Sequence, residues 1–176
     1  MQSVSGRPLL LKNLVFSFQV DFLAEVFPRA VFVHCRREPV FVAQSLLRCR
    51  ERISGSREDW FSVKPPEYPS LRERPYPDQI AGQVYHTRRH VERAFDRLAE
   101  GRSLRVDYER LVRDPLRSVG RIVEAVAEQG GSVEPWEAFD PPALRSTNEV
   151  RIDRREFERL RESCRRMFET QQESGD

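Results

Sequence analysis

The stretch FPRAVFVHCRREPVFVAQSLLR, residues 27–48, decides the fold of this chain. Residues 30–35 (AVFVHC) are mostly β-branched or aromatic and predict a buried strand. Pro39 suits the first turn of a helix that continues to about Arg52. The expected apolar face of this helix consists of Val42, Leu46, Leu47 and Cys49. A strand that leads directly into a helix is the repeating unit of a parallel sheet.

The flanking sequence extends this alternation of strands and helices. Residues 8–11 (PLLL) predict a buried strand, and residues 16–27 predict a helix that Pro28 stops. The remaining predicted elements are a strand over residues 103–109 and helices over residues 78–100, 114–129 and 153–172. Together they predict an α/β fold with a parallel sheet and right-handed crossovers, in a single domain over residues 1–176.

Residues 54–77 differ in kind, because they hold five prolines and several charged and aromatic side chains. A long irregular stretch inside a compact domain is usually a functional loop. Two readings of its aromatic residues stay open: Trp60 and Tyr68 either line an acceptor pocket or anchor the loop.

The composition favours a soluble cytoplasmic protein. The formal net charge is only +2, although all but two of the 30 basic residues are arginines, so bulk charge does not indicate a nucleic-acid or membrane partner. The cysteines, Cys35, Cys49 and Cys164, are odd in number and far apart, which fits a reducing compartment and argues against disulfides or a zinc site. Cys35 is expected to be buried in its strand. No apolar run approaches the roughly 20 residues of a membrane helix.

The end of the strand over residues 30–35 is the best place for chemistry. Ligands of parallel sheets bind beyond the carboxyl ends of the strands, and a helix N-terminus there offers free N–H groups to an anion. Arg37 can fork onto phosphate oxygens, and Ser45 faces the same strand end. The alternative is that Arg37 pairs with Glu38 or Glu25 and that Ser45 is an ordinary surface residue.

An Arg-x-Pro sequence at a strand end, followed by a helical Ser eight residues after the Arg, resembles the 3'-phosphate-binding motif of sulfotransferases that use 3'-phosphoadenosine 5'-phosphosulfate (PAPS). Arg37, Pro39 and Ser45 match this motif, with Glu38 in place of the usual Asp. Further similar segments follow the family's order between residues 7 and 152: RPLLLKN, FLAEVFPRAVFVH, WFSVKPPEY, LRVDYERLVRDPLRSVGRIVEAV and LRSTNEVR. The resemblance implies a three-layer parallel-sheet sandwich of the P-loop NTP hydrolase and sulfotransferase type.

The resemblance also implies roles for single residues. Arg37 and Ser45 would hold the 3'-phosphate of PAPS. Lys12 lies 25 residues before Arg37, where tyrosylprotein sulfotransferases place a catalytic lysine that stabilises charge on the bridging oxygen. The alternative for Lys12 is a surface lysine at a strand end.

Three later residues are implied as nucleotide contacts. Tyr108 would lie near the nucleotide or pack at the end of the strand over residues 103–109. Ser146 and Arg151 match the late loop that touches the nucleotide in this family. No metal is implied.

The sequence departs from the family pattern at its start. Nothing matches the glycine-rich loop ending in Lys/Arg-Ser-Gly-Thr-Thr that cradles the 5'-phosphosulfate, and Leu14 occupies the place of the catalytic His of cytosolic members. We therefore expect an N-terminally truncated fold that binds adenosine 3',5'-bisphosphate weakly and transfers no sulfate by itself.

Two other readings remain beside that of a sulfotransferase acting on a small-molecule, glycan or peptide acceptor. One is a non-catalytic remnant or interaction module with the same fold. The other, a P-loop kinase, is disfavoured because no GxxxxGK[ST] sequence occurs. A sheet without its first strand would expose an edge, which predicts a homo-oligomer or pairing with a complementing N-terminal segment.

His86 and His90 have the four-residue spacing of two metal ligands on a helix. No third ligand is evident, so the sequence favours a solvated helix face.

Overall fold

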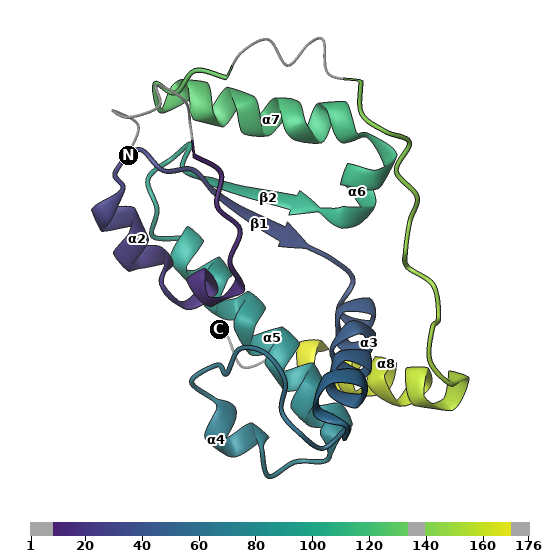
Figure 1. Cartoon of the computed structure of the whole chain (residues 1–176). Coiled ribbons are helices and arrows are strands. Elements are labelled where there is room, and N and C mark those ends of the chain that lie inside the picture. The colour runs from purple at the N-terminus through teal and green to yellow at the C-terminus, as the bar shows by residue number, and fades with distance from the viewer. Residues whose placement is uncertain (1–8, 134–139, 170–176) are drawn as a thin grey trace. The chain divides into compact units, whose positions relative to one another are not determined.

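The computed structural model describes residues 9–133 and 140–169 and shows a mixed helix and strand chain (Figure 1). Its elements are η1 (Leu14–Phe18), α2 (Val20–Val26), β1 (Phe32–Arg36), α3 (Pro39–Cys49), η2 (Arg50–Ser54), α4 (Tyr68–Leu71), α5 (Tyr76–Phe95), β2 (Ser103–Asp107), α6 (Tyr108–Arg113), α7 (Pro115–Glu128) and α8 (Arg154–Glu169). The described residues form two compact units. The first holds residues 9–36, 91–133 and 140–147, and the second holds residues 37–90 and 148–169.

The first unit contains the sheet. β1 and β2 pair in parallel, in a register that runs from Phe32 opposite Ser103 to Arg36 opposite Asp107. The strands expected over residues 30–35 and 103–109 are confirmed, with ends shifted by one or two residues. Parallel pairing is the arrangement that the alternation of strands and helices predicts.

The helix predicted after Asp114-Pro115 is confirmed as α7. The Asp114 side chain accepts a hydrogen bond from the backbone N–H of Arg117 at 3.1 Å, and Pro115 occupies the first turn, where its missing N–H costs nothing. Gly130, at φ +71°, follows the end of the helix in the left-handed conformation that glycine adopts without strain.

The start of the described chain differs from expectation. The strand predicted over residues 8–11 is wrong, because residues 9–11 form no strand and Leu10 is 89% exposed; Pro8 lies outside the described residues. A strand needs a neighbour for its backbone groups, and among the described residues β1 pairs with β2 alone. The helix predicted over residues 16–27 is divided into the 3₁₀ helix η1 and α2, and Pro28 follows its end.

The core of the first unit joins the last turns of α5 to the sheet. Val20, Val91, Ala94 and Phe95 are buried, with Phe32 and Leu98 packed against them. His34 contacts Glu92 through Nδ1 at 3.0 Å and meets the Phe95 ring edge-on at 5.9 Å, so it packs against α5. Successive strand residues point to opposite faces, so Cys35 points away from α5. It is exposed, and the prediction of a buried thiol is wrong.

The second unit is helical. Its core is formed by α3, the first turns of α5, and α8, and it contains Val40, Ala43, Leu47, Tyr76, Ile80, Ala81, Phe157, Leu160 and Cys164. The helix predicted from Pro39 is confirmed as α3, and its last turn widens into the π-helix η2. Gly55, at φ +77°, ends η2 in the left-handed region.

The proline-rich stretch over residues 54–77 is irregular apart from the end of η2, α4 and the start of α5. The buried Gln83 donates from Nε2 to the carbonyl oxygens of Phe61 at 2.9 Å and Val63 at 2.8 Å. Trp60 donates to the same Val63 carbonyl at 3.1 Å and meets the Tyr68 ring edge-on at 4.7 Å. These contacts support the anchoring role of the two aromatic residues.

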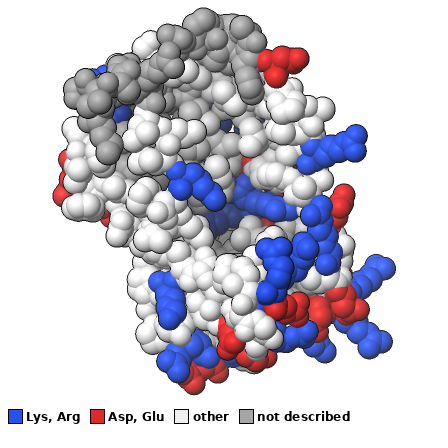
Figure 2. Space-filling model, in the orientation of Figure 1, with Lys and Arg blue, Asp and Glu red and all other residues white. Residues whose placement is uncertain are grey.

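The last predicted helix is confirmed as α8, although residues 170–172 lie outside the described residues. Asp153 caps its first turn by accepting from the backbone N–H of Arg155 at 2.9 Å. Its apolar seam is buried at Phe157, Leu160 and Cys164. Acidic and basic side chains alternate over its outer face (Figure 2), and ion pairs join them, including Arg165 with Glu162 at 2.8 Å. The outer surface of α8 is therefore laced with ion pairs.

No helix among the described residues is long and apolar enough to span a membrane. No cluster of three or more His, Cys, Asp or Glu side chains in residues 9–133 and 140–169 could hold a metal ion. The prediction of a single domain stays a prediction.

Candidate anion-binding site

Arg37 follows the end of β1 and is half-buried in the second unit. Its Nε donates to the side-chain oxygen of Asn148 at 2.7 Å, and its guanidinium lies 5.6 Å from the centre of the Phe41 ring. Both contacts are with uncharged groups, and they orient the guanidinium.

Ser45 lies on the exposed side of α3, two turns beyond Arg37. Its hydroxyl donates to the carbonyl oxygen of Phe41 at 3.0 Å, the usual bond of a helical serine to the residue four before it. Phe41 therefore contacts both candidate residues, Arg37 through its ring and Ser45 through its carbonyl group.

Gln44 is a residue that the sequence analysis missed. It is only 3% exposed, and both ends of its side-chain amide bind the segment after Asn148. Nε2 donates to the Glu149 carbonyl oxygen at 2.9 Å, and Oε1 accepts from the Arg151 N–H at 2.7 Å. The sequence gives only a weak signal for Gln44, because all it shows is a polar residue next to Ala43, which is buried in α3.

A pocket of about 700 Å³ opens beside this part of α3. It brings together Ser45 and Arg151, two of the residues that the sequence analysis selected, whereas Arg37 is not among the described residues that line it. Its lining is Ser45, Leu47, Arg48, Cys49, Glu51, Arg52, Arg57, Arg151, Ile152, Asp153 and Glu156. Arg48 and Arg52 were also missed, although their spacing from Ser45, three and seven residues, follows one helix face.

Arg50 is a buried residue between Cys49 and Glu51, both of which line this pocket. It is fully buried, donates to Gln79 Oε1 at 2.9 Å and to the Arg57 carbonyl oxygen at 3.2 Å, and lies 5.1 Å from the Trp60 ring centre. Burial lowers the pKa of Arg50 to about 10, and the charges of Glu58 and Asp59 oppose that shift. It holds the proline-rich loop and is not open to a ligand.

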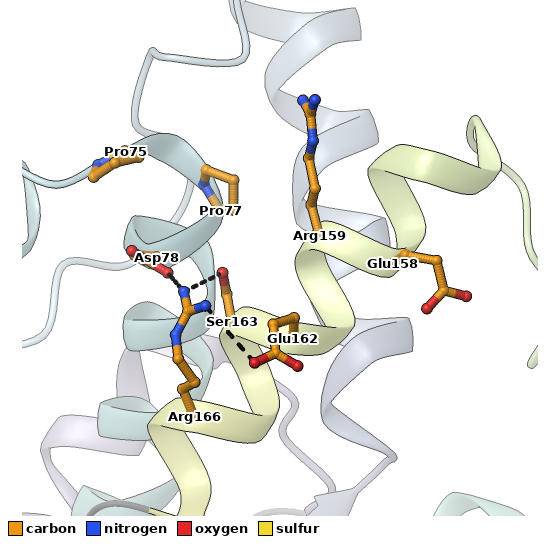
Figure 3. Close-up of a pocket in the computed structure, with 8 residues that line it drawn as sticks. All are labelled: Pro75, Pro77, Asp78, Glu158, Arg159, Glu162, Ser163 and Arg166. Atoms are coloured by element: carbon orange, nitrogen blue, oxygen red, sulfur yellow. Dashed lines mark hydrogen bonds and ion pairs between the residues drawn. The ribbon is translucent and has the colours of Figure 1, made fainter.

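A second pocket, of about 460 Å³, lies where the start of α5 meets α8 (Figure 3). Its arginines are already paired. Arg166 contacts Asp78 at 2.8 Å and Glu162 at 3.8 Å, and Arg159 contacts Glu156 at 2.9 Å. Figure 3 shows Arg166 directed at Asp78 and Ser163. This charge balance makes the second pocket a poorer anion site than the pocket beside α3.

The other candidate residues, Lys12, Tyr108 and Ser146, belong to the first unit. The Tyr108 hydroxyl accepts from the Thr147 N–H at 2.7 Å and lies 2.9 Å from the Thr147 hydroxyl oxygen, next to the exposed Ser146. Lys12 is exposed in an irregular stretch before η1. The structure thus joins the start of α6 to the late loop. The roles of all three residues in binding or catalysis stay predictions.

His86 and His90 do not form a solvated helix face, and that prediction is wrong. Their side chains are 17% and 28% exposed and share one carboxylate, that of Glu67, at 3.2 and 3.3 Å. Burial lowers the pKa of His86, and the Glu67 charge partly offsets the shift. The pair holds the residues before α4 against α5.

One comparison with known proteins gives a result. A family model described as "Sulfotransferase family" matches residues 2–129, which is most of the chain. Searches of curated proteins and of solved structures returned no match.

Proposed function

Because the chain belongs to the sulfotransferase family, we propose that it takes PAPS as its sulfuryl donor and holds the 3'-phosphate with Arg37 and Ser45. The observation that carries the proposal is their common contact with Phe41, whose ring lies under Arg37 and whose carbonyl group accepts from Ser45. A guanidinium just before a helix N-terminus suits a phosphate, and a hydroxyl two turns along the same helix adds a donor; each charge-assisted hydrogen bond contributes roughly 1.5–3 kcal/mol.

The donor-site proposal includes residues of the late loop. Arg151 lines the pocket with Ser45, and Gln44 fixes the backbone of Arg151. Tyr108 and Ser146 are proposed as further nucleotide contacts, supported by the two contacts of Tyr108 with Thr147.

In the reaction, an acceptor oxygen or nitrogen attacks the sulfur of PAPS while the bond from sulfur to the bridging oxygen breaks. Adenosine 3',5'-bisphosphate leaves, and the acceptor loses a proton. Lys12 is proposed to stabilise the negative charge on the bridging oxygen. We assign no general base, and the acceptor class, a small molecule, glycan or peptide, stays open.

Within this chain the donor-site residues account for one end of PAPS. No segment of the sequence matches Lys/Arg-Ser-Gly-Thr-Thr, and Arg37 and Ser45 cannot offset several missing bonds to the 5'-phosphosulfate. We therefore propose that the 176-residue polypeptide binds adenosine 3',5'-bisphosphate weakly and transfers no sulfate by itself. The three-layer sandwich belongs to the same proposal, supported by the parallel pairing of β1 and β2 and by α3 directly after β1.

Calorimetric titration of the chain with adenosine 3',5'-bisphosphate and with 5'-AMP tests this function. Preference for the bisphosphate supports a 3'-phosphate site, and equal or absent binding favours a non-catalytic module of the same fold. Turnover of labelled PAPS by the pure polypeptide would overturn the proposal that it is inactive alone.

A further inference from the structure

The outer side of α3 and η2 presents a row of polar side chains to the pocket of about 700 Å³. Ser45, Arg48 and Arg52 are all exposed and all line it. Their spacing of three and then four residues places them on one side of the helix. The opposite wall comes from the segment that leads into α8, which contributes Arg151.

The acidic residues of this pocket are already engaged. Glu51 pairs with Arg57 at 2.8 Å, and Glu156 pairs with Arg57 at 3.4 Å and Arg159 at 2.9 Å. Asp153 accepts the N–H groups that begin α8. Arg57 and Arg159 thereby balance the charges of Glu51 and Glu156, whereas Asp153 keeps its charge at the start of α8.

Arg48 and Arg52 are the uncompensated charges. Within residues 9–133 and 140–169, no hydrogen bond or ion pair joins either guanidinium to another side chain, whereas Arg151 pairs with Glu149 at 3.3 Å. Two guanidinium groups on one pocket wall, neither in an ion pair within the described residues, attract an anion with oxygens in the geometry of phosphate or sulfate.

We propose that this pocket binds a tetrahedral oxyanion, the phosphate or sulfate group of a ligand, through Arg48 and Arg52. The Ser45 hydroxyl becomes an additional donor when it rotates away from the Phe41 carbonyl oxygen. The proposal rests on the proposed function where it shares Ser45 with the 3'-phosphate site. It places two further arginines in the pocket that Ser45 lines and gives the class of the ligand group. The group comes either from the nucleotide or from a second anionic molecule, and the experiment separates these sources.

The probe is sodium sulfate, titrated into the ¹⁵N-labelled chain against sodium chloride of equal ionic strength. The side-chain Nε–H resonances of Arg48 and Arg52 report binding. We expect saturable shifts with sulfate alone and an affinity at least about tenfold weaker in the double variant Arg48→Gln/Arg52→Gln. The matched control, Arg161→Gln/Arg165→Gln, removes the same charge from α8 outside this pocket and should keep the wild-type affinity.

Equal weakening in both double variants, or shifts that do not saturate, would overturn the site. Displacement of sulfate by adenosine 3',5'-bisphosphate assigns the bound group to the nucleotide, and sulfate binding to the nucleotide-saturated protein assigns it to a second anion. If the bisphosphate does not bind while sulfate binding depends on Arg48 and Arg52, the proposed function fails and this inference stands. Suppose instead that the wild-type chain and the Arg48→Gln/Arg52→Gln variant prefer the bisphosphate over 5'-AMP to the same extent, and that sulfate does not bind. Then this inference fails and the proposed function stands.

Discussion

Gln44 accepts a hydrogen bond from the backbone N–H of Arg151 through its side-chain oxygen, at 2.7 Å, and the other end of the same amide donates to the carbonyl oxygen of Glu149. A single buried side chain of α3 thereby fixes the backbone that brings Arg151 to the pocket. Two bonds to one amide define both the position and the direction of that segment.

Replacing Gln44 by Ala should release residues 149–151. Each lost bond contributes roughly 0.5–1.5 kcal/mol, so we expect the backbone amide of Arg151 to exchange with solvent on the order of tenfold faster. Hydrogen exchange followed by NMR measures this rate. Ser45→Ala, at the next position of α3, loses only a bond within its own helix and should leave the rate unchanged; equal rates in the wild type and Gln44→Ala would contradict the assignment.

Arg50→Met should destabilise the second unit. The change removes two hydrogen bonds and a contact with the Trp60 ring, and leaves Gln79 Oε1 without its arginine donor. We expect the free energy of unfolding to fall by about 1–3 kcal/mol, measured by urea denaturation. The exposed Arg154 offers the control, since Arg154→Met should change it by less than about 0.5 kcal/mol. An unfolding free energy equal to wild type would show that Arg50 does not anchor the loop.

The contact of His86 with Glu67 predicts acid sensitivity. Burial lowers the pKa of His86, so its unfolded state binds a proton first and stability falls as pH drops below about 6.5. Burial alone would raise the pKa of Glu67, yet its backbone hydrogen bond and the two histidines lower it. That contribution is present above the unfolded pKa of about 4.3 and is lost as pH falls through the lower folded value.

The variant His86→Asn tests the upper part of this range. Asparagine places an N–H donor near the position of Nδ1 but does not titrate. Urea unfolding at a series of pH values should therefore show a shallower loss of stability as the pH falls below about 6.5 than in the wild type. An unchanged slope would show that His86 does not cause the acid sensitivity.

The sequence predicted most of the regular elements because their signals are local. Pro39 at the start of α3 and Asp114-Pro115 at the start of α7 mark helix ends that need no tertiary partner. Residues 9–11 show where local signals are insufficient. Three leucines form a strand only if another strand lies beside them, and the local sequence does not reveal such a neighbour. The prediction that Cys35 is buried was wrong for a related reason. Alternation along β1 places successive side chains on opposite faces of the sheet, but it does not tell which face a helix covers.

The candidate site was less predictable than the elements. The Arg-x-Pro pattern and a helical serine identified Arg37 and Ser45 from a resemblance. Their partners could not be found in this way, because Asn148 lies 111 residues from Arg37, and the Arg151 bonded to Gln44 lies 107 residues from it. Pairing of polar groups over such separations depends on the folded backbone. The spacing of Arg48 and Arg52 was readable, but their lack of counter-charges became visible only in the structure.

Exposed apolar residues in the first unit predict self-association. Among the described residues, β1 pairs with β2 alone. The part of the chain that precedes β1 exposes large hydrophobic side chains: Leu9, Leu10, Leu11, Leu14, Val15, Phe22, Val26 and Phe27. An open strand edge beside apolar surface tends to pair with another chain. Light scattering should show a dimer or larger species, and Leu10→Lys should shift it toward monomer. A monodisperse wild-type monomer would contradict this prediction.

The affinity for adenosine 3',5'-bisphosphate of the wild-type chain, Arg37→Ala and Arg37→Lys tests the donor site most directly, with Arg93→Ala as a control that removes an exposed arginine of α5. Isothermal titration calorimetry should show wild-type affinity in the control and a loss of at least about tenfold in Arg37→Ala, because a charge-assisted contact to the 3'-phosphate disappears. The affinity of Arg37→Lys should lie between those of the wild type and Arg37→Ala, since lysine keeps the positive charge but lacks the two-pronged donor geometry of the guanidinium. Equal affinity in the wild type and Arg37→Ala would contradict the assignment of Arg37 to the 3'-phosphate.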